Sequence, residues 1–170
     1  MSNEAKTKRV VNVPKQYFWD RLRAFGEIKT LLPDNIIEVK LPDNFSDSIG
    51  DVRSVYLGDP YPGEVIERLD GYEEGLSLTY SIVDKSCLPM LNYVACVNLK
   101  EISSNETDVT WCSHFVPDGA TEHEITELLE SLYSLIFDNI EDLKIYPVFI
   151  SHNFFKVKNN NIHLIGDAFF

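Results

Sequence analysis

Alternation of apolar and polar residues dominates the middle of the chain. In segment 76–83 every second residue is apolar, and serine or threonine stands between them. Segments 93–102 and 108–115 alternate in the same way, with Tyr93 and Trp111 among the apolar positions. Because strand side chains point to opposite faces in turn, each segment predicts a half-buried strand. The short connections between the segments predict an antiparallel sheet.

A helical period replaces this alternation in segment 121–143. Thr121 and Glu124 form a capping box at its start. A continuous apolar stripe then follows, made of Ile125, Leu128, Leu129, Leu132, Leu135, Ile136, Ile140 and Leu143. At ~1.5 Å per residue such a helix is about 33 Å long and can cross a whole sheet.

The remaining elements complete a fold prediction. Segment 10–13 reads as a first strand, and 15–34 as two short helical pieces interrupted at Gly26. The order predicts an α+β protein in which a curved antiparallel sheet wraps around the long C-terminal helix. An internal cavity between the sheet and the helix is part of this prediction.

Arg53 and Glu67 interrupt two strand-like segments, 50–57 and 63–70. Arg53 shares its alternation face with Val55 and Leu57, and Glu67 shares its face with other apolar residues. Charges buried on an apolar face are costly unless they are paired. The pattern therefore predicts a charged pair in a polar-lined cavity, whereas the alternative is two solvated strand charges.

Composition and charge narrow the function classes. The chain has 170 residues, 44% of them hydrophobic, and a formal net charge of −12. An acidic chain disfavours nucleic acid and anionic membranes, which bind largely through basic side chains. No apolar run is long enough for a membrane span, and the N-terminus does not resemble a secretory signal.

The cysteines predict no metal site. Cys87, Cys96 and Cys112 are dispersed without a ligand-type spacing, so a reduced, cytoplasmic protein without metal or cofactor is expected. No phosphate-binding glycine loop and no nucleophile elbow is present.

Five short motifs occur in order between about residues 8 and 143. They are Gly50-x-x-Arg53, Glu67-Arg68-Leu69-Asp70, Tyr80-Ser81-Ile82, Leu91-Asn92-Tyr93 and Pro117-Asp118-Gly119. With the element order, they make the chain resemble the START/Bet v 1-like (SRPBCC, helix-grip) superfamily. It is most similar to the polyketide cyclase/dehydrase and lipid-transport group, and more distantly to the plant abscisic-acid receptors.

This resemblance implies a set of cavity residues. Together with strand positions on the same apolar faces, the expected ligand-binding residues are Arg53, Val55, Leu57, Glu67, Tyr80, Tyr93, Trp111, Leu128, Leu132 and Ile136. The loops 58–64 and 85–92 lack the gate and latch sequences of the receptors. Hormone sensing with phosphatase partners is therefore not expected.

The resemblance leaves three functions open. The first is binding of a small hydrophobic, oxygen-bearing ligand of lipid, polyketide or terpenoid type. The second is a cyclase or dehydratase of the lyase type, in which Arg53 polarises a carbonyl, Glu67 acts as base and Tyr93 or Tyr80 donates a proton. The third is an interaction or assembly module.

The third alternative rests on the end of the chain. Residues 1–6 are expected to be a flexible N-terminus, 7–144 the START/Bet v 1-like domain, and 145–170 an extension. This extension reads as strand, turn and strand and carries Phe149, Phe154, Phe155, Phe169 and Phe170. Packing on its own domain, capping the cavity mouth and forming a homodimer all fit such an aromatic segment.

Overall fold

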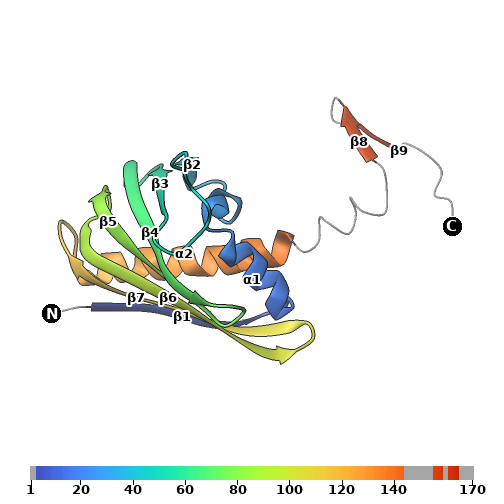
Figure 1. Ribbon diagram of the computed structural model, residues 1–170, viewed down its shortest axis with the longest axis horizontal. Helices are drawn as coiled ribbons and strands as arrows, with labels where there is room; N and C mark the ends of the chain where they lie inside the picture. Colours follow the sequence, from blue (N-terminus) through green and yellow to red (C-terminus); the bar gives the residue numbers. More distant parts are fainter. Residues whose placement is uncertain (1–2, 144–154, 159–160, 165–170) are drawn as a thin grey trace.

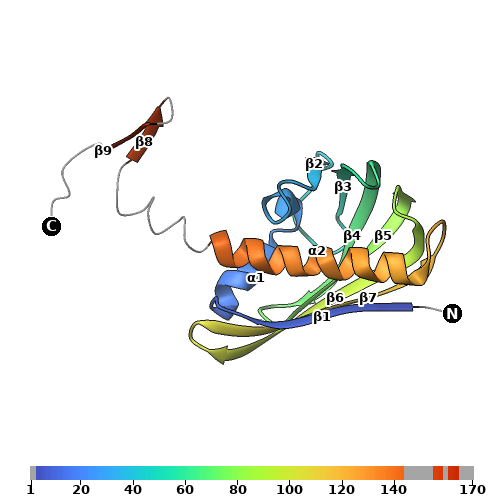
Figure 2. The ribbon, with the colours of Figure 1, turned by 180° about the vertical axis from the view of Figure 1, so that it is seen from behind.

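A seven-stranded antiparallel sheet and one long helix make up the body of the protein (Figures 1 and 2). The computed structural model describes residues 3–143, 155–158 and 161–164. The strands are β1 (Asn3–Val11), β2 (Ile36–Lys40), β3 (Val52–Leu57), β4 (Gly63–Glu73), β5 (Ser77–Ser86), β6 (Met90–Ser103) and β7 (Glu106–Pro117). The helices in this part are α1 (Lys15–Arg23), the 3-10 helix η1 (Phe25–Thr30) and α2 (Glu122–Leu143). The α+β prediction is confirmed.

The sheet order is β1-β7-β6-β5-β4-β3-β2, so the first strand pairs with the last one before α2. Alternate residues of β6 and β7 are buried, as the sequence pattern predicted. Val97 lies opposite Trp111, and Ala95 opposite Ser113, on this buried side. Figure 2 shows α2 crossing that face of the sheet, so the core lies between helix and strands.

Irregular pairing bends the sheet around α2. The register shifts twice between β4 and β5, at Val65/Glu67 and at Leu69/Gly71, and again between β6 and β7. Extra residues in one strand of a pair bend that strand and increase its twist. Because of these bends, one sheet contacts α2 and also the short helices α1 and η1.

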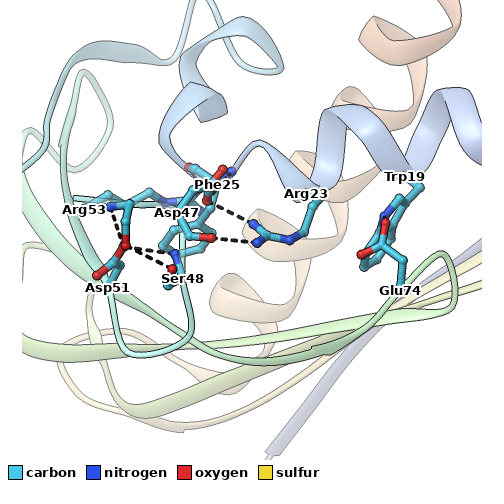
Figure 3. A network of polar contacts seen from close by, with 9 residues as sticks. Trp19, Arg23, Phe25, Asp47, Ser48, Asp51, Arg53 and Glu74 are labelled. Atoms are coloured by element: carbon cyan, nitrogen blue, oxygen red, sulfur yellow. Dashed lines mark hydrogen bonds and ion pairs between the residues drawn. The ribbon is translucent and has the colours of Figure 1, made fainter.

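The short helices α1 and η1 close one end of the core. Pro14 precedes α1, where its missing N–H costs nothing, and Phe18, Trp19, Leu22 and Phe25 are buried. Trp19 Nε1 donates a hydrogen bond of 2.6 Å to Glu74 Oε1 beyond β4 (Figure 3). This contact ties α1 to the turn between β4 and β5.

A network of polar contacts holds the loop before β3 against these helices (Figure 3). Arg23 Nη2 donates to the carbonyl of Asp47 at 2.6 Å, and Arg23 Nη1 lies 3.1 Å from Asp47 Oδ1. Asp51 Oδ2 accepts backbone hydrogen bonds from Ser46 and Ser48 at 2.8 and 3.0 Å. The loop is thereby closed just before the strand that carries Arg53.

Strand β1 is longer than the sequence indicated. It begins at Asn3, so residues 3–6 belong to the sheet rather than to a flexible N-terminus. Its outward residues, Glu4, Lys6 and Lys8, are polar, and its inward residues include Thr7, which made the alternation hard to see.

Helix α2 covers the free edge of β1. The backbone N–H of Lys6 donates to Glu130 Oε1 at 3.1 Å, and that of Asn12 donates to Glu141 Oε1 at 2.9 Å. Arg9 forms an ion pair with Asp138 of α2 at 2.7 Å. Carboxylates of α2 thus occupy backbone donors that an edge strand would otherwise expose.

Strands β8 (Phe155–Lys158) and β9 (Asn161–Leu164) pair with each other in a separate antiparallel sheet. Phe149, Phe154, Phe169 and Phe170 lie outside the described residues, as do the contacts on which capping or dimer formation would depend. Within the described part of the chain, no helix combines the length and the apolar character needed to cross a bilayer.

Candidate functional site

Arg53 and Glu67 stand directly opposite each other on β3 and β4. Arg53 Nε and Nη2 both lie 2.7 Å from Glu67 Oε2. The Arg53 side chain is 5% exposed and that of Glu67 15%, so the ion pair is largely withdrawn from water. The charges that the sequence singled out therefore form one cross-strand pair on the inner face of the sheet.

The third nitrogen of Arg53 joins the pair to η1. Nη1 donates a short hydrogen bond to the carbonyl of Phe25. The guanidinium carbon lies 3.8 Å from the centre of the Phe25 ring and 5.8 Å from that of Tyr80. All three guanidinium nitrogens are thus committed to protein groups, which holds the positive charge in place.

A chain of hydroxyl groups runs through the core beside this pair. The Tyr80 and Tyr93 hydroxyls are 3.0 Å apart, and those of Tyr93 and Tyr133 2.8 Å. Tyr133 donates on to Ser113 Oγ at 2.6 Å. Four elements, β5, β6, α2 and β7, each contribute one member of this tyrosine–serine chain.

Burial raises the pKa of the Tyr80, Tyr93 and Tyr133 phenols well above the usual tyrosine value. The three groups are therefore neutral at physiological pH and can act as hydrogen-bond donors or acceptors. Trp111 stacks on Tyr133, with ring centres 5.1 Å apart and planes inclined by 13°. This packing fixes the direction of the Tyr133 hydroxyl.

A cavity of about 80 Å³ lies between these two polar groups. Its wall includes the predicted ligand residues Arg53, Val55, Leu57, Glu67, Tyr80, Tyr93, Trp111, Leu132 and Ile136. Apart from the ion pair and the tyrosines, the wall is built of aliphatic side chains and Trp111.

Leu128 is the predicted ligand residue that this cavity wall lacks. It lines a separate hollow of about 70 Å³ together with Leu132 and Tyr61. The buried residues of α2 in the wall of the first cavity are Leu129, Tyr133 and Ile136. Leu128 lies on the flank of these residues.

Tyr133 and Ser113 are the site residues that sequence reasoning missed. Tyr133 falls four residues after Leu129 and three before Ile136, so the helical period contained the signal. Because Tyr133 carries a hydroxyl group, it does not read as a member of the apolar stripe. Ser113 shares its alternation face with Trp111 and Phe115, but nothing in the sequence indicates a partner for it.

Two residues of the cavity wall, Trp111 and Glu67, each carry a polar atom with no hydrogen bond to other described residues. Trp111 Nε1 is buried without a partner. Glu67 uses Oε2 for Arg53, and no described residue donates to Oε1. A buried donor without a partner is unusual in folded proteins and is normally satisfied by water or a ligand. These two residues of the wall therefore retain one donor and one acceptor that water or a ligand can satisfy.

Comparison with known proteins supports the fold. No family model and no curated protein matches the chain. Among solved structures, the protein XoxI from Bacillus cereus matches with a TM-score of 0.71 and 24% identity, over 86% of this chain and 98% of that one. An uncharacterised Bacillus thuringiensis protein matches with a TM-score of 0.69 and 24% identity, over 84% and 98%. This likeness is one of fold alone.

Proposed function

We propose that this protein binds a small, mostly apolar molecule with one or two oxygen atoms in the cavity between the sheet and α2. The observation that supports it best is the buried, unpartnered indole N–H of Trp111, a residue of the largely aliphatic cavity wall. Pockets for small molecules typically combine an apolar lining with a few well-placed polar groups. Glu67 Oε1 would accept from a ligand hydroxyl, and Trp111 Nε1 would donate to a ligand oxygen.

Cavity size restricts the ligand. An engineered cavity of about 150 Å³ binds benzene, and this one measures about 80 Å³. The ligand is therefore compact, or side chains such as those of Leu88 and Ile28 move to admit something larger. A long-chain lipid fits this proposal less well than a small terpenoid or phenolic fragment.

The proposal includes membership of the START/Bet v 1-like superfamily. Its support is the ordered set of five motifs together with the seven-stranded sheet and long helix. A cyclase or dehydratase is the weaker alternative. Arg53 already directs all three nitrogens at protein groups, and the Tyr93 hydroxyl is already bonded on both sides.

Ligand binding can be tested with purified protein and matched probes. Native mass spectrometry would identify a co-purifying molecule, and titration calorimetry would compare phenol with toluene. We expect phenol to bind more tightly by about tenfold, the effect of one added hydrogen bond of about 1.4 kcal/mol. Leu132 is a half-buried residue of the cavity wall, and the larger side chain of Leu132→Trp should fill the cavity and abolish binding.

Ser131→Trp is the matched control, because Ser131 is exposed on α2. It should bind the probes as the unchanged protein does. The proposal would be contradicted if no compact apolar molecule bound to the protein. It would also be contradicted if folded Leu132→Trp bound the probes as tightly as the unchanged protein.

A further inference from the structure

The outer face of the sheet carries a cluster of potential metal ligands that the cavity does not use. Cys112 and His114 are two residues apart on β7 and therefore point to the same side, opposite to Trp111 and Ser113. The strand register places Glu4 of β1 across from His114 and Cys96 of β6 across from Cys112. Residues far apart in the sequence thus meet on one surface.

Three of these side chains are close enough to share one ion. The ligand atoms of Glu4, Cys112 and His114 all lie within 4.8 Å of one another. His114 Nε2 is 3.9 Å from Glu4 Oε2. Bond lengths at tetrahedral zinc, near 2.0 Å to nitrogen or oxygen and 2.3 Å to sulfur, set donor atoms about 3.5 Å apart. Side-chain rotations that move each donor atom by about 1 Å would bring the three to the spacing that one zinc ion requires.

Exposure makes the cluster accessible and adjustable. The side chains of His114 and Glu4 are 56% and 52% exposed, and Cys112 is half-buried beneath them. None of the three residues is part of the hydrophobic core, so substitutions of these ligands need not unfold the protein. The cysteines are free thiols, as metal binding requires.

We propose that Glu4, Cys112 and His114 bind a zinc-class divalent cation on the outer face of the sheet, with solvent in the fourth position. Sulfur, imidazole and carboxylate donors together suit zinc better than calcium or magnesium, which prefer oxygen ligands alone. The bound ion would link β1 to β7. It would therefore stabilise the N-terminal strand against detachment from the sheet.

Lys6 opposes this site and gives an internal check. It lies opposite Cys112 on β1, and its positive charge would repel a cation. Because Lys6 is exposed, its side chain can turn towards solvent. Lys6→Gln should therefore strengthen metal binding by several-fold in low salt, where charges are least screened.

The test is a titration of the full-length, chelator-treated protein with Co²⁺ and then Zn²⁺ under a phosphine reductant. Co²⁺ bound by a thiolate gives a sulfur-to-metal charge-transfer band, and tetrahedral Co²⁺ gives intense visible bands that Zn²⁺ removes by displacement. We expect one ion per chain. Cys112→Ser should lose the charge-transfer band, and His114→Ala or Glu4→Gln should weaken binding by about tenfold or more.

Controls use the same residue types elsewhere in the chain. Cys87, near Tyr61, and His123, on α2, lie away from the cluster, so Cys87→Ala and His123→Ala should bind as the unchanged protein does. Cys96→Ser should also bind and would remove the option of a Cys96–Cys112 disulfide. Circular dichroism confirms that each variant is folded.

Three outcomes would overturn the proposal. The first is no charge-transfer band in the unchanged, reduced protein. The second is a band that survives in Cys112→Ser. The third is binding lost in Cys96→Ser but kept in Glu4→Gln and His114→Ala, because the donors would then be a cysteine pair. Since the cluster lies outside the cavity, none of these results bears on the proposed ligand.

Discussion

Arg53 shows how a buried charge can organise its surroundings. Its guanidinium connects β4, through Glu67, with η1, through the carbonyl of Phe25. Burying two charges costs several kcal/mol each, which the pair recovers only through close contacts and additional hydrogen bonds. Removing one partner should therefore be far more harmful than removing both.

Arg53→Met should lower the free energy of unfolding by about 3–5 kcal/mol, because Glu67 would keep a buried charge without its partner. Urea denaturation measures this change. The double variant Arg53→Met/Glu67→Leu should regain most of the loss. Arg68→Ala, which breaks the more exposed pair with Asp70, is the control and should cost less than about 1 kcal/mol. Equal losses in the two arginine variants would contradict this account.

Tyr133 is the residue on which the hydroxyl chain depends. Tyr133→Phe removes its hydrogen bonds to Ser113 and Tyr93 and leaves a buried serine without a partner. We expect a loss of about 1–3 kcal/mol in chemical denaturation. For comparison, Tyr61→Phe should change stability by less than about 0.5 kcal/mol, since no described residue bonds to that hydroxyl. A Tyr133→Phe protein as stable as the parent would show that the chain contributes nothing.

The buried tyrosines also predict an alkaline limit to stability. Burial raises the pKa of Tyr80, Tyr93 and Tyr133 in the folded protein. Below about pH 10 the phenols are neutral in both states and add no pH dependence. Above it they ionise only in the unfolded chain, so the free energy of unfolding falls by about 1.4 kcal/mol per pH unit for each tyrosine.

Denaturation curves between pH 8 and 11.5, with phenolate absorbance as a second signal, would reveal this fall. Tyr133→Phe should make it shallower by about one third. A free energy of unfolding that stays constant above pH 10, or that falls as steeply in Tyr133→Phe as in the unchanged protein, would refute the prediction.

At the scale of single elements, α2 depends on its first turn for its position. The Thr121 hydroxyl accepts from the backbone N–H of Glu124 at 3.2 Å, and Glu124 Oε2 accepts from the Thr121 backbone N–H at 2.8 Å. Thr121→Ala should cost about 1 kcal/mol, measured by thermal denaturation. Thr126→Ala, inside the same helix, should have a much smaller effect. Similar losses in both variants would argue against a capping role.

Elements differ in how far the sequence alone reveals them. Strands β5 to β7 were predictable because one face is apolar and the other polar, which produces a visible period of two. The start of β1 was not predictable. Glu4, Lys6 and Lys8 face solvent, and carboxylates of α2 accept the backbone hydrogen bonds at this edge. Arg53 and Glu67 stood out because charge on an apolar face is rare.

The sequence does not predict which residues of different elements contact each other. Which residues of two strands meet depends on register, and one bulge shifts every pair beyond it. The meeting of Cys112 with Glu4, and of Tyr133 with Ser113, depends on such three-dimensional placement. Spacing along the chain carries no information about either.

For the whole molecule, the buried residues of the described core run from Ala5 to Ile140. A protein ending at residue 144 should therefore fold and unfold cooperatively, with an unfolding temperature within a few degrees of that of the full chain. Differential scanning calorimetry checks this expectation. Loss of the transition would mean that residues 145–170 belong to the folding unit.

The same truncated protein separates the functional alternatives. Sedimentation analysis of both forms would show whether the extension promotes self-association, as an assembly module requires. If the extension only accompanies a ligand-binding domain, both forms should sediment as the same species and bind the same probes.

The two borders of the large sheet differ, and this limits how copies of the protein could join. The β1 border is occupied by carboxylates of α2. On the β2 border Ile37 is 63% exposed, and among the described residues only Lys29 Nζ donates to its carbonyl. A molecule with one open border can pair through it once, about a two-fold axis, and then has no border left to offer. Sheet-to-sheet association of the described domain would thus stop at two copies instead of growing into a fibre.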